Sequence, residues 1–356
     1  MKKKILITGG AGFIGINAAA HFLRKKCEVT IYDNFFRKGS KENVQWLRSS
    51  KSRKPNIVLG DISRPSKDLT EAVKNADIIL HMAAQVAVTT SIKDPLFDFN
   101  TNLLGTINLL EIMRREKSKA ILIYGSTNKV YGSLSYLPIK ENKLRYQFAR
   151  EKQGVSENMP LDFYTPYACS KGSADQYVRD YARIYGLKNI VFRQSCIFGP
   201  HQFGIEDQGW VAWLLISAML KKRVTIYGNG KQVRDLLYID DLLEAIDRAC
   251  ESIRTTSGEI YNIGGGIKNT ISVWSEFGPM IEEILGEKIN ATYLPWRQGD
   301  QKIFYADIAK AKKDFGWTPK TTVSSGIRML FQWLKENKNG FTHFFDENNA
   351  GLYSAQ

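Results

Sequence analysis

The segment Thr8–Gly15, with the sequence TGGAGFIG, constrains the fold of this chain more than any other stretch. It follows the apolar run Ile5–Ile7 and opens an apolar stretch with helical spacing, which predicts a strand, a tight glycine turn and a helix. Gly9 can adopt backbone angles that other residues avoid, Gly12 leaves room for a phosphate beside the main chain, and Gly15 lets the helix pack close to the strand. Because free N–H groups at a helix start attract anions, the turn is expected to hold a pyrophosphate.

A carboxylate follows the glycine turn at the spacing that a dinucleotide site requires. Asp33 ends a second apolar segment, Cys27–Tyr32, where it can accept a hydrogen bond from the 2′-hydroxyl of an adenosine ribose. A carboxylate there repels a 2′-phosphate, which favours NAD as the cofactor. Arg37 and Lys38 favour NADP instead, because a cation beside the ribose accommodates the extra phosphate. We weigh Asp33 more heavily, since it is expected at the strand end and the two cations lie in the loop beyond it.

Strand-like and helix-like segments alternate in the first half of the chain, which predicts an α/β fold with a doubly wound parallel sheet of the Rossmann type. The expected strands are Ile5–Thr8, Glu28–Tyr32, Asn56–Gly60, Ile78–His81, Ala120–Tyr124 and Asn189–Phe192. The expected helices are Gly12–Arg24, Phe97–Arg115, Tyr167–Tyr185, Gln208–Leu220, Asp240–Glu251, Ile271–Leu285 and Val323–Glu336. We place a dinucleotide-binding domain at residues 1–195, a smaller C-terminal α/β lobe at 196–337 with some segments returning to the main sheet, and a tail at 338–356.

The formal net charge is +14, from 50 basic and 36 acidic residues, and it raises the possibility of nucleic-acid binding. The basic clusters, such as Lys2–Lys4 and Lys221–Arg223, are scattered along the chain without interleaved aromatic residues. This distribution favours a solvated lysine surface that attracts anionic small molecules, with no nucleic-acid partner.

The 4 cysteines and 4 histidines lie far apart without metal-ligand spacing, so we expect neither a metal site nor a disulfide framework. The basic start followed by an apolar run resembles a secretory signal, but the run carries the phosphate turn and lacks a cleavage site. The longest later apolar stretch, Trp210–Leu220, is too short to span a bilayer. We therefore expect a cytoplasmic protein without a membrane partner.

A tyrosine and a lysine with helical spacing form the candidate catalytic pair. Tyr167 and Lys171 are four residues apart at the start of an expected helix and share one face. A lysine close to a tyrosine stabilises the phenolate and lowers the pKa of the phenol toward the range of a general acid or base, which hydride abstraction from a sugar carbinol requires. Thr127, just after the strand Ala120–Tyr124, can hydrogen-bond the reacting oxygen. Each feature alone is common, but their order after a phosphate-binding turn favours a catalytic role.

Together these segments resemble the extended short-chain dehydrogenase/reductase family over essentially the whole chain. The resemblance rests on the glycine turn, His81–Ala84, Asn102 with Gly105–Thr106, the Thr127 segment, the Tyr167/Lys171 pair, Arg234–Asp235 and Arg297–Asp300, which occur in the family's order. It implies NAD as cofactor, Tyr167 as base, Lys171 as its electrostatic partner and nicotinamide-ribose ligand, and Thr127 as the sugar-side hydroxyl. It also implies that Arg234 and Arg297 hold the diphosphate of a nucleotide sugar.

The subfamily can be narrowed. Sugar-nucleotide 4,6-dehydratases of this family carry an Asp-Glu pair directly after the catalytic threonine, and here those positions are Asn128 and Lys129, which speaks against dehydration. Several stretches resemble the CDP-tyvelose epimerases, also called CDP-paratose 2-epimerases: Asp33–Leu47, Gln85–Ile92, Ser126–Gly132, Leu144–Asp162, Asp207–Val211 and Gly228–Asp235. This resemblance implies 2-epimerisation of a CDP-hexose by transient oxidation at carbon-2. A UDP-hexose 4-epimerase is the alternative within enzymes, and a non-catalytic NAD-binding regulator is the alternative outside them.

The resemblance implies two sets of contacts. The cofactor contacts are Gly9, Gly12, Phe13, Ile14, Gly15, Asp33, Asn34, Arg37, Asp61, Ile62, His81, Ala83, Ala84, Asn102, Tyr167 and Lys171. The substrate contacts are Gln85, Ser91, Thr127, Asn128, Lys129, Cys196, Gln208, Gly209, Arg234, Arg297 and Asp300. Cys196 stands where an asparagine of the family commonly orients the nucleotide sugar. By analogy with the family, the expected partners are a nucleotide-diphosphate sugar, with a CDP-hexose favoured, and further copies of the chain in a dimer or tetramer.

Overall fold

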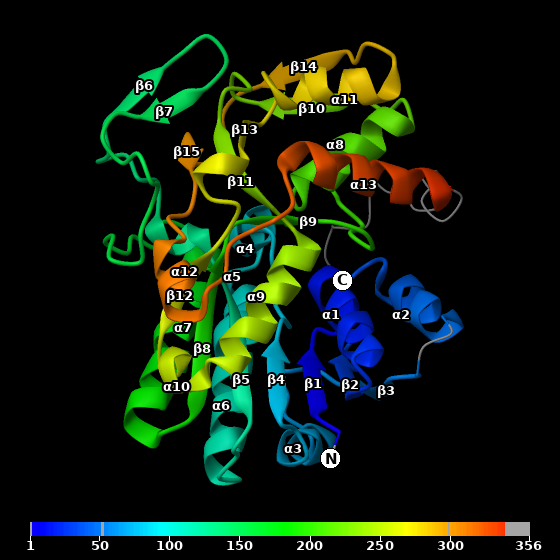
Figure 1. The fold of residues 1–356 in the computed structure, drawn as a ribbon, viewed down its shortest axis with the longest axis vertical. Coiled ribbons are helices and arrows are strands. Elements are labelled where there is room, and N and C mark those ends of the chain that lie inside the picture. The colour runs from blue at the N-terminus through cyan, green and yellow to red at the C-terminus, as the bar shows by residue number, and fades with distance from the viewer. Residues whose placement is uncertain (1, 51–52, 298, 339–356) are drawn as a thin grey trace.

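A seven-stranded parallel sheet forms the centre of the molecule in the computed structural model, which describes residues 2–50, 53–297 and 299–338 (Figure 1). Its strands are β1 (Lys4–Thr8), β2 (Glu28–Asp33), β3 (Asn56–Leu59), β4 (Ile78–His81), β5 (Ile121–Thr127), β8 (Lys188–Gln194) and β12 (Ile260–Ile263). They lie in the order β12-β8-β5-β4-β1-β2-β3, and every neighbouring pair is parallel. The predicted doubly wound α/β sheet is therefore confirmed.

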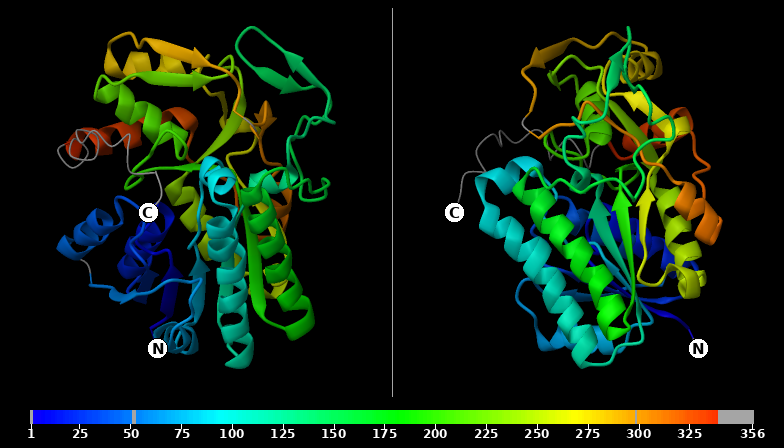
Figure 2. Two further views of the ribbon diagram at one scale, coloured as in Figure 1. Left: turned by 180° about the vertical axis from the view of Figure 1, so that it is seen from behind. Right: turned by 90° about the vertical axis from the view of Figure 1, so that its left-hand side faces the viewer.

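Helices cover both faces of this sheet (Figure 2). Alternate residues of the strands point to opposite faces, and the apolar core divides accordingly. One cluster joins Ile5, Ile7 and their neighbours to α1 (Phe13–Arg24), α2 (Ser40–Ser49) and α9 (Ile239–Glu251). The other joins Leu6 and its neighbours to α3 (Lys67–Lys74), α6 (Gly105–Arg115) and α7 (Pro166–Tyr185). Burial on both faces explains why the strands are nearly continuous apolar runs.

The smaller lobe lies beyond the carboxyl ends of the central strands (Figure 1). One of its sheets contains β9 (Cys196–Phe198), β11 (Val233–Tyr238), β13 (Thr270–Ser272) and β15 (Ile303–Phe304), and a second pairs β10 (Val224–Tyr227) with β14 (Ala291–Leu294). Its helices include α8 (Trp210–Met219), α11 (Phe277–Leu285) and α13 (Val323–Glu336). A hairpin of β6 (Ile139–Glu141) and β7 (Tyr146–Phe148) stands beside it. The shorter elements are α4 (Val88–Lys93), α10 (Ile253–Thr256), α12 (Ala309–Phe315), η2 (Asn128–Tyr131) and η3 (Ile267–Asn269).

Two expected helices differ from the structure. The expected helix Phe97–Arg115 is divided into α5 (Pro95–Phe99), a π-helical turn η1 (Asn100–Leu104) and α6. Helix α5 starts earlier than expected because Asp94 caps it by accepting a hydrogen bond from the Phe97 N–H at 2.9 Å. The expected helix Ile271–Leu285 starts only at Phe277, because the preceding β13 pairs antiparallel with β11.

β5 extends beyond the expected strand and includes Thr127, and β12 is a seventh strand that the alternation did not predict. Most of the expected tail, residues 339–356, lies outside the described residues. No helix within the described ranges is long and apolar enough to cross a membrane.

A buried ion pair ties α7 to the sheet. Arg193 on β8 donates to both oxygens of the Asp175 carboxylate on α7, at 2.8 and 3.1 Å, and the two side chains are 2% and 0% exposed. Ser126 on β5 donates to the same carboxylate at 2.8 Å, and Arg193 also donates to the Tyr131 hydroxyl at 3.0 Å. The carboxylate thereby joins β5, β8 and α7 directly below the carboxyl end of the sheet.

Replacing Arg193 with Met should lower the free energy of unfolding by about 3–5 kcal/mol, because the Asp175 carboxylate then stays buried without its cation. Urea unfolding followed by tryptophan fluorescence measures the change. The double variant Arg193→Met/Asp175→Leu should recover much of the loss, since neither charge remains. As a matched control, Arg114→Met removes the exposed partner of Glu111 and should barely move the urea midpoint. An Arg193→Met variant as stable as the parent would contradict this account.

Candidate active site

The glycine turn after β1 has the shape of an anion cradle. Gly9 has a φ of +67°, and a Cβ there would lie 2.6 Å from the main-chain nitrogen of Ala83. A Cβ on Gly12 would meet only the Gly9 carbonyl, at 3.3 Å, so this side of the turn is open. Among the described residues, no side chain caps the first turn of α1, whose N–H groups can therefore donate to a phosphate. The turn fits the pyrophosphate of a dinucleotide.

Asp33 joins this turn to the next loop. Its carboxylate accepts hydrogen bonds from the main-chain N–H groups of Ala11, at 3.0 Å, and Phe35, at 2.8 Å. Burial raises the pKa of this carboxyl, and the two N–H donors oppose that shift. Asn34 donates to Asp61 at 3.2 Å on the neighbouring loop. These contacts fix a carboxylate at the end of β2, where the sequence predicted it.

Arg37 contacts the smaller lobe. Its guanidinium donates to the side-chain oxygen of Gln208, so two residues assigned to different ligands meet each other. Asn43 on α2 reinforces this connection by donating to the carbonyl groups of Ala11, at 3.0 Å, and His201, at 3.4 Å. The cofactor half and the lobe are therefore joined beside the glycine turn.

The structure brings Thr127, Tyr167 and Lys171 together at the carboxyl end of β5. Tyr167 and Lys171 are 8% and 3% exposed. Lys171 Nζ donates to the Gly125 carbonyl at 2.5 Å and lies 4.2 Å from the centre of the Tyr124 ring. The Thr127 hydroxyl makes a side-chain hydrogen bond with Tyr167. The side chains that the sequence grouped therefore share one buried site.

The pKa values of the pair differ from the expectation. Burial raises the pKa of Tyr167 to about 12, although the hydrogen bond with Thr127 lowers it. Burial also lowers the pKa of Lys171 to about 7. The expectation that Lys171 lowers the pKa of the phenol is wrong for this structure, because the ammonium donates to the Gly125 carbonyl and burial of Tyr167 outweighs its hydrogen bond with Thr127. Lys171 is therefore the member of the pair that titrates near neutral pH.

A buried polar cluster packs beneath the start of α7. Gln85 donates from its amide to the Ala87 carbonyl and to Asp98, both at 2.8 Å, and its main-chain N–H donates to Asn102 at 2.9 Å. Ser91 accepts a hydrogen bond from the Tyr167 N–H at 3.1 Å. Gln85 and Ser91 are buried, and these two candidate substrate contacts hydrogen-bond protein groups around the start of α7.

His81 is also a buried support. Its ring nitrogens are 2.7 Å from the Thr8 hydroxyl and 3.0 Å from the Thr106 hydroxyl. Burial lowers the pKa of His81 to about 3, with a further contribution from Lys171, so the ring is neutral at neutral pH. The side chain of His81, which we assigned to the cofactor, therefore has both nitrogens engaged by threonines.

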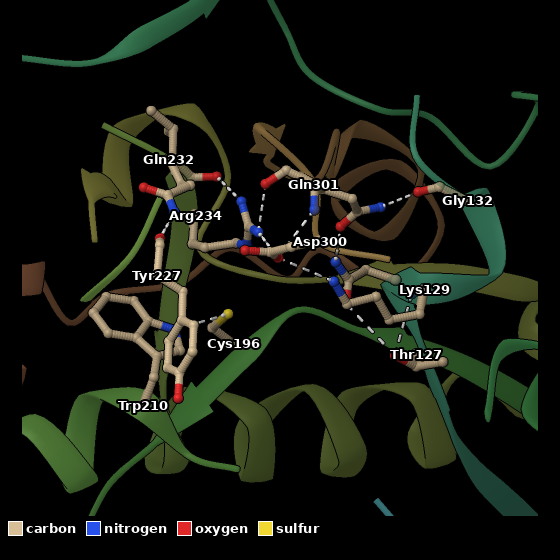
Figure 3. A network of polar contacts seen from close by, with 12 residues as sticks. Thr127, Lys129, Gly132, Cys196, Trp210, Tyr227, Gln232, Arg234, Asp300 and Gln301 are labelled. Carbon is tan, nitrogen blue, oxygen red and sulfur yellow. Dashed lines mark hydrogen bonds and ion pairs between the residues drawn. The ribbon is translucent and has the colours of Figure 1, made fainter. Parts of the chain in front are cut away.

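Three of the candidate substrate contacts, Lys129, Cys196 and Asp300, lie around Arg234 on β11 (Figure 3). Arg234 donates to the Asp300 carboxylate at 2.7 Å and to the Gln301 carbonyl at 2.6 Å, and Lys129 lies 3.6 Å from the same carboxylate. Burial raises the pKa of Asp300, but the two cations outweigh it and leave that pKa below its usual value. Asn128 donates to the Gln301 side chain at 3.1 Å. The two positions that carry acids in dehydratases are thus tied to the loop that holds Asp300 and Gln301.

Two further candidates lie at the edges of this cluster. Cys196 accepts a hydrogen bond from the Trp210 indole at 3.5 Å, next to Gly209, which precedes α8 with a φ of +77°. Arg297 lies 3.1 Å from Asp207 and stacks over the Tyr227 ring at 3.7 Å. Both arginines predicted to hold a diphosphate are therefore already paired with acids of this chain.

Sequence reasoning missed several residues of this site. They are Asp98, Ser170, Asp175, Arg193, Trp210 and Gln301. Asp98 had a detectable signal, because it precedes Asn102 by four residues in the expected helix Phe97–Arg115, and this spacing puts two side chains on one helix face. The others become evident only when distant segments meet.

Comparison with known proteins places the chain in a family. A family model described as GDP-mannose 4,6 dehydratase matches residues 6–330. The chain is 41% identical over 337 residues to CDP-paratose 2-epimerase of Salmonella typhi, covering 93% of this chain and 98% of that protein. The solved structure of UDP-glucose 4-epimerase with UDP-glucose from Thermotoga maritima has a TM-score of 0.80 at 28% identity, covering 94% of this chain and 99% of that one. UDP-glucuronic acid 4-epimerase from Bacillus cereus, in complex with UDP-glucuronic acid and NAD, has a TM-score of 0.79 at 28% identity with the same coverage. With its open glycine turn and its Thr127–Tyr167–Lys171 site, the chain belongs to the GDP-mannose 4,6-dehydratase family of extended short-chain dehydrogenases/reductases.

Proposed function

We propose that this chain is an NAD-dependent nucleotide-sugar epimerase that inverts carbon-2 of a CDP-hexose, as in the conversion of CDP-paratose to CDP-tyvelose. The observation that carries the proposal is the buried meeting of Thr127, Tyr167 and Lys171 above β5, combined with Asn128 and Lys129 at the dehydratase positions. The 41% identity to CDP-paratose 2-epimerase over nearly the whole of both chains supports it. NAD is bound in the Bacillus cereus neighbour, and the open glycine turn with Asp33 fits the same cofactor.

The residues of the chain have distinct roles in this reaction. NAD, when bound, supplies the acceptor and the donor of the hydride. Thr127 and Tyr167 bind the carbon-2 hydroxyl, and Tyr167 receives its proton in the phenolate form as the carbonyl forms. The hydrogen bond with Thr127, which lowers the pKa of Tyr167, favours that form. Lys171 lies with Tyr167 on one face of α7 and, in its protonated form, places a positive charge next to the site. When the carbonyl is reduced on its other face, Tyr167 returns the proton to the oxygen, so the inversion would involve no net redox change.

The lobe binds the nucleotide part of the substrate. Arg234 and Arg297 present guanidinium groups that match the geometry of a diphosphate. Asp300 pairs with Arg234 and Asp207 pairs with Arg297, so the diphosphate joins or replaces those carboxylates. Lys129 adds a third cation close to Arg234 through their shared partner Asp300.

A UDP-hexose 4-epimerase is the second candidate. The UDP-sugar 4-epimerases of Thermotoga maritima and Bacillus cereus align over 94% of this chain, and such an enzyme would use the same three residues on a differently seated sugar. Incubation with CDP- and UDP-hexoses, followed by NMR of the products, distinguishes the two. Inversion at carbon-2 of a CDP-hexose supports our proposal, and inversion only at carbon-4 of UDP-hexoses overturns it.

Three other features stay predictions. We place the boundary between the dinucleotide-binding domain and the nucleotide-sugar lobe at residues 195–196, with β12 as the segment that returns to the sheet. We expect a homo-oligomer, a dimer or tetramer, and a cytoplasmic location. Analytical ultracentrifugation and cell fractionation test these expectations.

Tyr167→Phe should lower turnover by roughly 10²-fold or more, the scale of a lost general base, while folding and NAD content are retained. Steady-state kinetics and the NAD released on heating measure both quantities. Tyr177→Phe removes an exposed hydroxyl from the same helix and serves as the matched control. Near-normal turnover of Tyr167→Phe would show that the base is another residue.

Arg234→Ala and Arg297→Ala should each raise the KM for the nucleotide sugar more than they lower kcat, because a diphosphate is remote from the reacting carbon. Initial rates over a range of substrate concentrations separate the two parameters. A large fall in kcat at unchanged KM would assign these arginines to the chemical step.

Epimerisation in heavy water should give product without solvent deuterium at carbon-2, because the hydrogen that leaves this carbon returns to it. The alternative route oxidises carbon-3 and exchanges the carbon-2 proton through an enolate, which needs an additional acid/base pair. The dehydratase-type acids that could serve are replaced by Asn128 and Lys129, and these contact Gln301 and Asp300. NMR of product from a single turnover decides, and substantial deuterium at carbon-2 would establish the enolate route.

A further inference from the structure

We propose that Asp98 is a positioning residue of this site: its buried carboxylate fixes the first turns of α7 through Ser170 and holds a negative charge that acts on the Lys171 ammonium. The inference rests on the roles proposed above for Tyr167 and Lys171. Asp98 lies on α5, directly before the π-helical turn η1.

The Asp98 carboxylate is fully buried and accepts hydrogen bonds from three side chains. Oδ1 accepts from the Gln85 amide at 2.8 Å and from the Asn102 amide at 3.0 Å, and Oδ2 accepts from the Ser170 hydroxyl. No cation of the described ranges lies within ion-pair distance of it. A carboxylate in this environment is costly unless its charge does something that an amide or a hydroxyl could not do.

The hydrogen bonds of Asp98 converge on the catalytic helix. Ser170 lies between Tyr167 and Lys171 in the first turns of α7, so a bond to Ser170 fixes the rotation of the turn that carries both. Ser91 on α4 accepts from the Tyr167 N–H at 3.1 Å and holds the same end of the helix. The α4–α5 segment therefore sets where the phenol and the ammonium lie relative to Thr127.

The charge of Asp98 also reaches the pair. It raises the pKa of Lys171 against the larger effect of burial, and it raises the pKa of Tyr167. Burial raises the pKa of Asp98 itself, and Ser170, Gln85 and Lys171 oppose that shift.

Other groups also face Lys171. Asp175 on α7 carries a second negative charge, and it is neutralised in part by Arg193. Tyr124 on β5 presents its ring and His81 on β4 is neutral. Asp98 is therefore the carboxylate without a paired cation that favours the protonated form of Lys171.

Asp98→Asn tests the charge separately from the shape. The amide has the size of the carboxylate, can accept from Gln85 and Asn102 through its oxygen, and can donate to the Ser170 hydroxyl. Asp94→Asn is the matched control, because Asp94 is an exposed carboxylate of the same helix start and asparagine also caps helices.

The experiment follows the titration of Lys171 in the full chain labelled with ¹³C at the lysine ε-carbons. The Lys171 resonance is identified by its absence in Lys171→Met. We expect a midpoint near pH 7 in the parent chain and in Asp94→Asn. In Asp98→Asn we expect a midpoint lower by about one pH unit or more, since the carboxylate no longer favours the ammonium. A folded Asp98→Asn chain with the parental midpoint would overturn the inference.

If Asp98→Asn does not fold, the variant Ser170→Ala provides a second test of the inference. It removes the link between Asp98 and α7. It should lower kcat severalfold at an unchanged KM for the nucleotide sugar, because, among the described residues, the hydrogen bonds of Ser170 are with Asp98, Asn102 and the Tyr167 carbonyl and not with the lobe. An unchanged kcat would overturn the inference. Failure of the proposed function is a different result, in which no nucleotide sugar is converted although the Lys171 midpoint still responds to Asp98→Asn.

Discussion

The hydrogen bond from the Lys171 ammonium to the Gly125 carbonyl is the contact on which the site depends. It joins α7 to β5, the strand whose last residue is Thr127. Because Lys171 is almost fully buried, its charge is stable only if each neighbour is a carbonyl, an aromatic face or a carboxylate at the right place. The parallel sheet supplies that environment, since it gathers the ends of β4, β5 and β8 at one edge.

Two buried carboxylates, Asp175 and Asp98, hold helix α7 in place. Asp175 is bound to Arg193 and Ser126 and ties α7 to the sheet, whereas Asp98 binds Ser170 and ties α7 to α5. The first has its own cation and belongs to the architecture. The second has none, so its field is free to act on the neighbouring ammonium. The two carboxylates are similarly buried, but their electrostatic effects differ because only Asp175 has a paired cation.

The sequence was informative wherever a local pattern decides the outcome. The apolar period of Val323–Glu336 predicted α13 to the residue, and the glycine turn with Asp33 predicted the cofactor half. Local patterns could not reveal β12 or β13, whose identity as strands depends on distant partners. In the site, the grouping of Thr127, Tyr167 and Lys171 could be predicted because each residue belongs to a short sequence motif. The burial of Gln85 and His81 could not be predicted, since the donors and acceptors that surround them come from other segments of the chain.

The π-helical turn Asn100–Leu104 makes this part of the chain sensitive to length. A π-turn contains one residue more than the α-helical turn that it replaces. Deleting one residue there would rotate α6 by about 100° relative to α5. Asn102 could then no longer reach both Asp98 and the Gln85 carbonyl while α6 kept its apolar face on the sheet. A substitution in this segment keeps the chain length and so can leave both sets of contacts intact. After a single-residue deletion, either the apolar face of α6 would leave the core or Asn102 would lose its contacts in the site.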